Sequence, residues 1–299
     1  PKRSFADGYH LLGFPFAFSN PDAIDALGLG GTVQLASYDT NAREYRYAAD
    51  DGVALQAGRG YWLHLQSPTT VSLKGAAAIN QRSPYRLSLT QGWNLISSPY
   101  LFSIEWGQCR VYYGDTEYTM EEAMRQGFLR PELWSWSPSN ESYAPLNSMR
   151  AEIKPYIGYW LYATDAVMLV YSPNPFVPAM DPLTPGARAR TAASGDNWQV
   201  NLLVEAAGAR DTMNTFGVHP EELDGPSRGD MMEPPISPAG LSAYFARRTW
   251  GRASGEYAVD LQAPGGMKTW TYEIQCRKPG VQVVLRWPDM TRVPANVPI

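Results

Sequence analysis

Residues 60–65 read Gly-Tyr-Trp-Leu-His-Leu, and residues 158–162 read Gly-Tyr-Trp-Leu-Tyr. Both runs are rich in aromatic and apolar side chains, which suit pleated, half-buried strands. Side chains alternate between the two faces of a strand, so Tyr61 is predicted to share one face with the leucines while Trp62 lies on the other. The two runs therefore predict two equivalent buried strands.

These strands close a longer internal repeat. Residues 8–16 (Gly-Tyr-His-Leu-Leu-Gly-Phe-Pro-Phe) parallel residues 92–100 (Gly-Trp-Asn-Leu-Ile-Ser-Ser-Pro-Tyr) at an offset of 84. The offset grows to 98 for Tyr38 with Trp136, Tyr45 with Tyr143, and residues 60–63 with 158–161, so the second copy carries 14 additional residues. A register kept over this length indicates one supersecondary unit used twice.

Each copy is predicted to contain a strand that ends at a proline, a short helix, a hairpin and a last strand. The helix of copy one is expected to begin at Asn20-Pro21 and to end at Gly28, and that of copy two to begin with a capping box of Thr119 and Glu122 and to end at Gly127. The hairpins are expected to turn through residues 39–41 and 138–140.

We predict an all-β fold with two short helices, in which two tandem modules are followed by a β-sandwich. The expected divisions are copy one at 1–80, copy two with its insertion at 81–172, a proline-rich linker at 173–195, and an immunoglobulin- or fibronectin-like sandwich at 196–299. Composition agrees with this class, because 12% aromatic residues accompany 26 Gly and 25 Pro.

Charge and hydropathy argue against several partners. The net charge is −4 and no Lys/Arg cluster interrupts it, which argues against nucleic acid. No apolar run approaches the roughly 20 residues of a membrane helix, so we expect no membrane-spanning segment. Cys109 and Cys276 can form a disulfide in an oxidising compartment or remain two unpaired thiols, and the sequence favours unpaired thiols without deciding.

Part of the chain resembles known modules. Gly-Trp-Asn-Leu-Ile-Ser-x-Pro at 92–99, a Trp/Tyr hairpin, and Gly-Arg-Gly-Tyr-Trp at 58–62 look like β-modules of large secreted or surface bacterial proteins. Copy two departs from this pattern, since Ile157 precedes its Gly158. Residues 198–288 resemble the immunoglobulin- or fibronectin-like domain that follows such modules. The resemblance implies an extracellular or cell-surface location and no established chemistry.

The sequence offers little catalytic chemistry. The histidines are His10, His64 and His219. The repeat replaces His64 by Tyr162, and His219 lacks a partner nucleophile. No G-x-S-x-G, Walker, H-E-x-x-H or dinucleotide motif occurs. We therefore expect a non-catalytic protein without an organic cofactor.

One loop is a candidate ion site. Hard cations such as Ca²⁺ prefer several oxygen ligands, and this loop supplies Asp211, Asn214, Asp224, Asp230 and Glu233. The alternative is that these carboxylates accept hydrogen bonds from nearby backbone amides, and we favour this alternative.

Aromatic rings are the other candidates, because flat rings can stack on sugars. The candidate ligand-binding residues are Trp106, Tyr112, Tyr113, Trp134 and Trp136. The alternative is that the rings form the core of small β-modules. The 14-residue insertion of copy two is its most individual surface, and the copies differ over residues 103–118. Repeat-specific insertions often carry function.

Two functions from different classes follow. The first is a structural or interaction segment of a larger protein, for adhesion, assembly or display, with a protein partner or the parent polypeptide. The second is a carbohydrate-binding accessory region of a secreted enzyme. Function is expected in residues 103–118 or at an open edge of the third domain, where a further strand could add.

Overall fold

The computed structural model describes residues 1–28, 34–178, 196–291 and 293–294. Within these residues it is mostly strand (49%) and 8% helical, and its three α-helices are short. The predicted all-β class is confirmed. The chain divides into two compact units, Pro1–Pro138 with Ala144–Pro178, and Ser139–Tyr143 with Ala179–Ile299.

Copy one is built around a four-stranded antiparallel sheet in the order β2-β6-β4-β5, and two-stranded sheets β1-β7 and β3-β8 accompany it. Its elements are β1 (Lys2–Phe5), β2 (Gly8–Gly13), β3 (Phe16–Phe18), α1 (Ala23–Leu27), β4 (Gln34–Asp39), β5 (Glu44–Tyr47), α2 (Ala48–Asp51), β6 (Gly60–Leu65), β7 (Thr69–Ser72) and β8 (Ala76–Ala78).

Copy two contains a sheet in the order β10-β17-β14-β15, a second sheet β13-β12-β18-β9, and the pair β11-β16. Its elements are β9 (Tyr85–Leu89), β10 (Gly92–Ser97), β11 (Ile104–Glu105), the 3-10 helix η1 (Trp106–Gln108), β12 (Arg110–Tyr113), β13 (Thr116–Thr119), α3 (Met120–Arg125), β14 (Leu129–Ser137), β15 (Ser142–Leu146), β16 (Glu152–Ile153), β17 (Gly158–Ala163) and β18 (Val167–Tyr171).

The main sheets of the two copies have the same strand order and the same register. Tyr9 pairs with His64 in copy one, and Trp93 pairs with Tyr162 at the equivalent position of copy two. The inserted residues of copy two form the hairpin β12-β13, which extends the second sheet beside β18. The repeat in the sequence is therefore also a repeat in the fold.

The predicted N-cap of the helix is confirmed in copy two, whereas in copy one the N-cap lies two residues after the predicted one. Thr119 and Glu122 form the predicted capping box at the start of α3. In copy one the N-cap is Asp22, whose carboxylate accepts from the N–H groups of Ile24 and Asp25. The predicted N-cap Asn20 accepts instead from the N–H of Asp22. The four-residue helix α2 was not predicted.

The capping box predicts a stability effect. Thr119→Ala removes the hydroxyl that accepts from the N–H of Glu122, and loss of such a cap costs about 1 kcal/mol. We expect the free energy of unfolding to fall by that amount in urea denaturation. Glu121→Ala is the control, because Glu121 is exposed and lies in the same turn without capping it; an equal loss in both variants contradicts the assignment.

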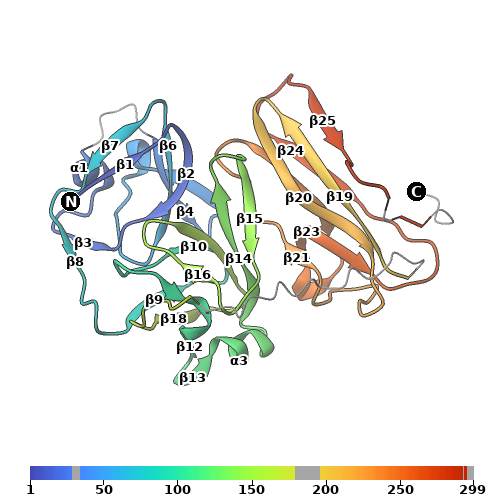
Figure 1. Cartoon of the computed structure of the whole chain (residues 1–299), viewed down its shortest axis with the longest axis horizontal. Helices are drawn as coiled ribbons and strands as arrows, with labels where there is room; N and C mark the ends of the chain where they lie inside the picture. Colours follow the sequence, from blue (N-terminus) through green and yellow to red (C-terminus); the bar gives the residue numbers. More distant parts are fainter. Residues whose placement is uncertain (29–33, 179–195, 292, 295–299) are drawn as a thin grey trace. The chain divides into compact units, whose positions relative to one another are not determined.

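The second unit contains β19 (Trp198–Ala206), β20 (Ala209–Val218), β21 (Met231–Met232), β22 (Leu241–Arg247), the 3-10 helix η2 (Gly251–Ala253), β23 (Gly255–Gln262), β24 (Tyr272–Cys276) and β25 (Val283–Arg286). The long hairpin β19-β20 is drawn in yellow and orange in Figure 1. These strands form one sheet, ordered β24-β22-β23-β20-β19-β25, with β21 beside β23.

The strands of the predicted sandwich form one continuous sheet. Parallel pairing of β20 with β23 joins its two halves by hydrogen bonds. Val204 and Ala206 of β19 nevertheless pack against Leu241 and Ala243 of β22, which is not a neighbouring strand. The sheet therefore curls, so that its two halves enclose a common core.

The start of the predicted linker lies along copy two. The N–H of Phe176 donates to the carbonyl of Ser103 at 2.7 Å, and Pro175 forms a β-bridge with Ile104. The remainder of that predicted linker, residues 179–195, lies outside the described residues.

Candidate functional site

The strands β6 and β17 have two covered faces. Tyr61, Leu63 and Leu65 lie in the core of copy one, as the alternation predicts. Tyr159 and Leu161 take the equivalent place in the core of copy two. The opposite faces carry Trp62 and Trp160, which are also buried. Something other than its own core therefore covers the second face of each sheet.

The second face of each sheet is covered by the other copy. Trp62 of copy one meets Trp136 of copy two edge-to-face, with ring centroids 5.0 Å apart. Trp160 of copy two meets Tyr38 of copy one in the same manner at 4.8 Å. Since Tyr38 and Trp136 are equivalent positions of the repeat, one contact is made twice in opposite directions.

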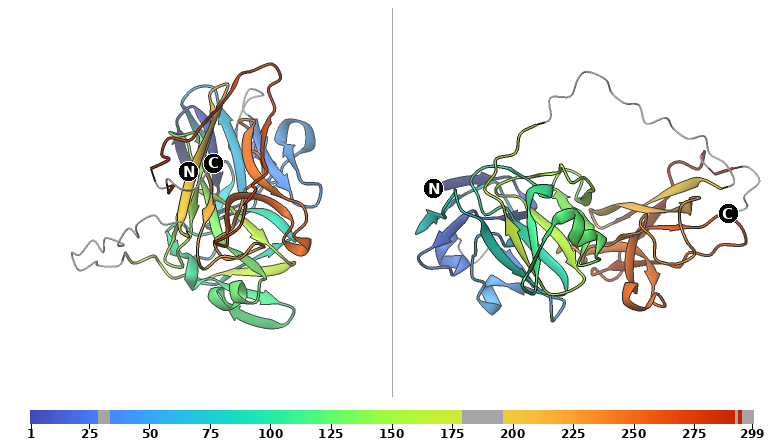
Figure 2. Two further views of the ribbon diagram at one scale, coloured as in Figure 1. Left: turned by 90° about the vertical axis from the view of Figure 1, so that its right-hand side faces the viewer. Right: turned by 90° about the horizontal axis from the view of Figure 1, so that it is seen from below.

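Hydrogen bonds accompany these rings in both directions. Trp136 Nε1–H donates to the carbonyl of Tyr9 at 3.0 Å. In copy one, Thr40 follows the end of β4, the strand equivalent to β14. Its Oγ1–H donates to the carbonyl of Trp93 at 2.6 Å. Tyr9 and Trp93 are themselves equivalent positions. Figure 2 shows the blue strands of copy one beside the green strands of copy two within this unit.

Two equivalent glycines allow the backbones of the copies to approach closely. A Cβ atom at Gly60 would lie 2.9 Å from the carbonyl oxygen of Ile96. A Cβ at Gly158 would lie 2.9 Å from both N and O of Leu12. Real Cβ contacts are longer than this, so only glycine fits at either position. The glycine that precedes each Tyr-Trp pair is therefore a requirement of the contact between copies.

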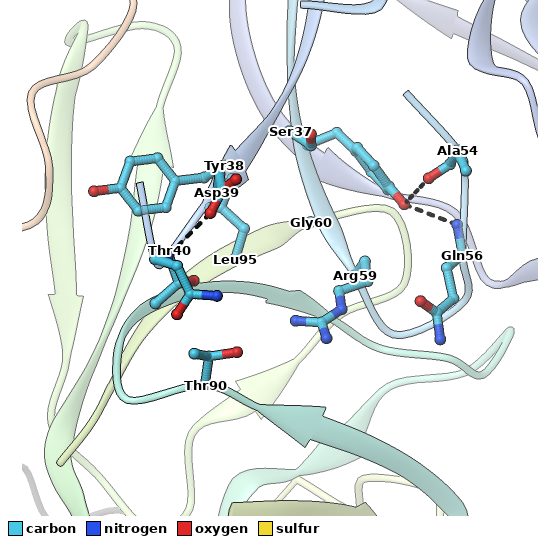
Figure 3. A pocket seen from close by; sticks show the side chains of 12 residues that line it. Ser37, Tyr38, Asp39, Thr40, Ala54, Gln56, Arg59, Gly60, Thr90 and Leu95 are labelled. Atoms are coloured by element: carbon cyan, nitrogen blue, oxygen red, sulfur yellow. Dashed lines mark hydrogen bonds between the residues drawn. The ribbon is translucent and has the colours of Figure 1, made fainter. Parts of the chain in front are cut away.

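A polar pocket opens beside this interface on the copy-one side (Figure 3). Its volume is about 290 Å³, and its lining comes from the β4-β5 turn, from the segment before β6, and from Thr90 and Leu95 of copy two. The lining residues are Ser37, Tyr38, Asp39, Thr40, Asn41, Ala54, Gln56, Arg59, Gly60, Tyr61, Thr90 and Leu95. Hydroxyl, amide and charged groups dominate this set.

Arg59 is held firmly at the pocket. Its backbone forms a β-bridge with Ile96, and the preceding carbonyl of Gly58 accepts from the N–H of Ser97 at 2.9 Å. Its Nη2 donates to the carbonyl of Ser88 at 2.7 Å. Among the described residues no carboxylate pairs with this guanidinium.

Asp39 contributes a negative charge, and its Oδ1 already accepts two backbone hydrogen bonds. The N–H groups of Asn41 and Ala42 each donate to its Oδ1 at 3.0 Å, and Arg46 lies 3.5 Å from its Oδ2. These contacts, the N–H of Ala42 first, hold the pKa of Asp39 below its usual value. Asp39 and Arg59 lie on opposite sides of the pocket in Figure 3.

Copy two has different residues at three polar positions of this pocket. Arg59, Thr40 and Gln56 correspond at the offset of 98 to Ile157, Pro138 and Lys154. The scaffold still repeats, since Tyr61 and Tyr159 accept at their hydroxyls from the N–H groups of residues 56 and 154. The pocket is thus a feature of copy one on a framework that both copies share.

Comparison with known proteins adds no relative to this picture. No protein-family model, curated protein or solved structure matches this chain. The functional argument therefore rests on the pocket and on the interface between the copies.

Three of the five predicted ring candidates are buried. Trp106, Trp134 and Trp136 are 1%, 0% and 8% exposed, so they present no free face to a ligand. Trp106 belongs to the core of copy two, and Trp136 is part of the interface between the copies. This burial agrees with the alternative that the rings form the core of the modules, because small β-modules use large rings to fill their interior.

Tyr112 and Tyr113 lie at the surface on β12. Arg86 lies over the Tyr112 ring at 5.3 Å, and the Tyr112 hydroxyl donates to Glu117. Tyr113 is 43% exposed and stacks on Phe128 at 4.5 Å. Neither tyrosine lines the pocket.

The five predicted calcium ligands do not form one site. Asp224 pairs with Lys268 at 2.6 Å, and Asp230 accepts from the N–H groups of Ser227 and Leu261. Asp211 accepts from Asn214 Nδ2 and from the N–H of residue 243. Within the described ranges, no three His, Cys, Asp or Glu side chains gather as metal ligands. This arrangement agrees with the favoured alternative, because amide groups and a lysine already satisfy the oxygens of Asp211, Asp224 and Asp230.

A β-bulge brings Asp211 and Asn214 to one face. The register of β19 with β20 shifts between Leu202 and Val204, so that Leu202 faces Asn214 and Val204 faces Asp211. Residues three apart then both point inward, where regular alternation would separate them. Glu233 is also buried, and it lies close enough to Asp211 for the charge of Asp211 to raise its pKa.

These carboxyls make the second unit sensitive to pH. Burial raises the pKa of Asp211 to about 6, and burial together with the charges of Asp211 and Glu256 raises that of Glu233. A raised folded-state pKa contributes stability below the unfolded pKa, and this contribution is lost as pH rises through the folded pKa. We expect the unit to lose about 2–3 kcal/mol between pH 4 and pH 7 from Asp211 alone, at roughly 1.4 kcal/mol per pKa unit.

Hydrogen exchange of β20 and β22 at pH 4 and pH 7 measures this change. Asp211→Asn removes the titrating group and should flatten the pH dependence. Asp224→Asn is the contrasting variant, because Lys268 lowers the pKa of Asp224, and its contribution is lost as pH falls. A pH dependence that Asp211→Asn leaves unchanged contradicts the assignment.

The histidines and cysteines take part in local structure. His64 stacks on Tyr9 at 4.2 Å, and burial lowers its pKa. His10 Nε2 contacts the carbonyl of Ala6 at 2.9 Å, and His219 Nδ1 accepts from the N–H of residue 221. Both thiols are free, and burial raises the pKa of Cys109 to about 12.

Sequence reasoning missed the pocket although it quoted some of its residues. Asp39, Thr40 and Asn41 were interpreted only as a turn, and Arg59 only as part of a motif. One signal was available: Arg59 stands where copy two has an isoleucine. When one copy has a charged residue and the other does not, the shared fold does not require that charge at the position.

Proposed function

We propose that this chain is a non-catalytic structural and interaction segment of a larger extracellular or cell-surface protein, for adhesion, assembly or display. The reciprocal interface between the copies carries this proposal. The aromatic contacts and the glycine approaches recur in both directions, so the double module is expected to be a single rigid body. Such a body suits a mechanical or spacing role.

No helix among the described residues is long and apolar enough to cross a membrane. The proposed partners are another protein or the parent polypeptide. Location outside the cell and the absence of nucleic-acid partners belong to the proposal, and they rest on the module resemblance and on the acidic net charge.

Single-molecule force spectroscopy tests the rigid-body proposal. The chain is stretched between flanking marker domains of known length. We expect the double module to unfold in one step that releases roughly 600 Å of contour, at about 3.6 Å per residue. Two separate steps of about half this length would mean that the copies are independent, and would contradict the proposal.

The pocket favours a second function, binding of carbohydrate as an accessory region of a secreted enzyme. Hydroxyls of Ser37, Thr40 and Thr90 and amides of Asn41 and Gln56 line a space of about 290 Å³, close to the roughly 300 Å³ at which ligand pockets begin. Sugar hydroxyls both donate and accept, as these groups do.

Amide chemical shifts report this binding residue by residue. On addition of soluble sugars we expect shifts at Asn41 and Thr90 and none on β12. Shifts confined to Tyr112 and Tyr113 would mean that sugar binds at the exposed hairpin and not in the pocket. If no sugar causes any shift, the second function is overturned.

A further inference from the structure

We infer that the copy-one pocket takes a saccharide that carries a carboxylate, and that Arg59 binds this carboxylate. The inference deepens the carbohydrate-binding proposal and rests on it. It starts from the guanidinium of Arg59, which is partly buried and, within the described ranges, has no carboxylate partner.

Arg59 is oriented before any ligand arrives. One nitrogen, Nη2, is anchored on the carbonyl of Ser88 at 2.7 Å, and the backbone is tied to Ile96. Figure 3 shows the rest of the guanidinium directed toward the pocket, opposite Thr40 and Thr90. A guanidinium fork matches the two oxygens of a carboxylate, and a side chain fixed in advance loses little entropy on binding.

The remaining lining favours hydroxyl groups over a second anionic group. Asp39 stands across the pocket from Arg59, and its pKa is lowered, so it is ionised at neutral pH. A ligand with negative charge on both sides would be repelled there, whereas sugar hydroxyls can donate to that carboxylate. The Arg59 side of the pocket therefore favours a ligand carboxylate. The opposite side, with Asp39, Thr40 and Asn41, favours ligand hydroxyls.

The repeat supplies an internal comparison. Copy two has Ile157 at the position of Arg59 and Pro138 at the position of Thr40. The shared scaffold therefore does not require a guanidinium here. Its presence in copy one alone fits a ligand contact better than a packing role.

Glucuronate and glucose are matched probes, because they differ only by the carboxylate. We expect glucuronate to shift the amides of Asn41 and Thr90 with weak, about millimolar affinity, and glucose to bind at least about tenfold more weakly. Acetate at equal concentration is the third probe, and it should bind no better than glucose. Added salt should weaken glucuronate binding, because a charge pair is screened.

Arg59→Gln should raise the dissociation constant of glucuronate about tenfold and leave that of glucose nearly unchanged. Arg59→Lys, which keeps the charge but not the fork, should lie between. Arg82→Gln is the control, an exposed arginine of the same unit that does not line the pocket. Unchanged amide spectra away from the pocket establish that each variant is folded.

The outcomes separate the inference from the function beneath it. Equal binding of both sugars, unaffected by Arg59→Gln, overturns the role of the carboxylate and leaves carbohydrate binding standing. Acetate binding as tightly as glucuronate shows that a carboxylate alone is recognised, and overturns the saccharide. No binding of any sugar overturns both proposals.

Discussion

Trp160→Ala should destabilise the first unit by about 3–5 kcal/mol, the usual cost of removing a fully buried tryptophan. Trp160 is fully buried and contacts Tyr38 of copy one and Trp93 of copy two. Because the contact with Tyr38 joins the copies, we expect hydrogen-exchange protection to fall in β4 of copy one as well as in β17. Urea denaturation gives the size of the loss, and exchange gives its place.

Two further variants serve as controls for Trp160→Ala. Leu101→Ala removes a side chain that is 44% exposed in the same copy, and it should change stability by less than about 0.5 kcal/mol. Trp160→Phe keeps an aromatic ring and should lose less than alanine. Loss of protection restricted to copy two would show that the ring contact does not couple the copies.

Gly158→Val should cost about 3 kcal/mol or more, because a Cβ there would lie 2.9 Å from the backbone of Leu12. Backbone atoms of a buried strand cannot rotate aside as a flexible side chain can, so the copies must separate locally. Gly60→Val at the equivalent position faces the carbonyl of Ile96, and should have a similar effect. Thermal and urea unfolding measure both variants.

Gly225→Val is the matched control, since a Cβ at Gly225 has no atom within 4 Å and its backbone does not require glycine. We expect it to leave the unfolding of the first unit unchanged. A small effect at both Gly158 and Gly60 would show that the close approach between copies is dispensable for stability, and would weaken the rigid-body proposal.

Local features were predictable because neighbouring residues encode them. The alternation of Tyr61 and Trp62 sets their opposite faces, whichever partner each face meets. The capping box of Thr119 and Glu122 is complete within one turn of helix. Interpretations failed where a local signal had a competitor nearby, as when Asp22 rather than Asn20 capped α1.

The exposure and the spatial grouping of the candidate side chains were not predictable, for a different reason. Trp136 and Tyr113 are both aromatic residues next to a hairpin turn, yet one is 8% exposed and the other 43%. Sequence patterns tell which face of a strand a ring occupies, but not what covers that face. The same limit hid the separation of Asp224 from Asp211, since each finds its partner far along the chain.

The Gly-Tyr-Trp-Leu runs by themselves determined that this chain is all-β, that its module is used twice, and which side chains share a face. These properties follow from strand periodicity and repeat register, which can be recognised from the order of residues along the chain. Only the tertiary structure decided that Trp62 meets Trp136, that Gly158 must remain glycine against Leu12, and that Arg59 borders a pocket with Thr90. Those outcomes depend on how two copies pack, and packing is set by shape and distance between segments far apart in the chain.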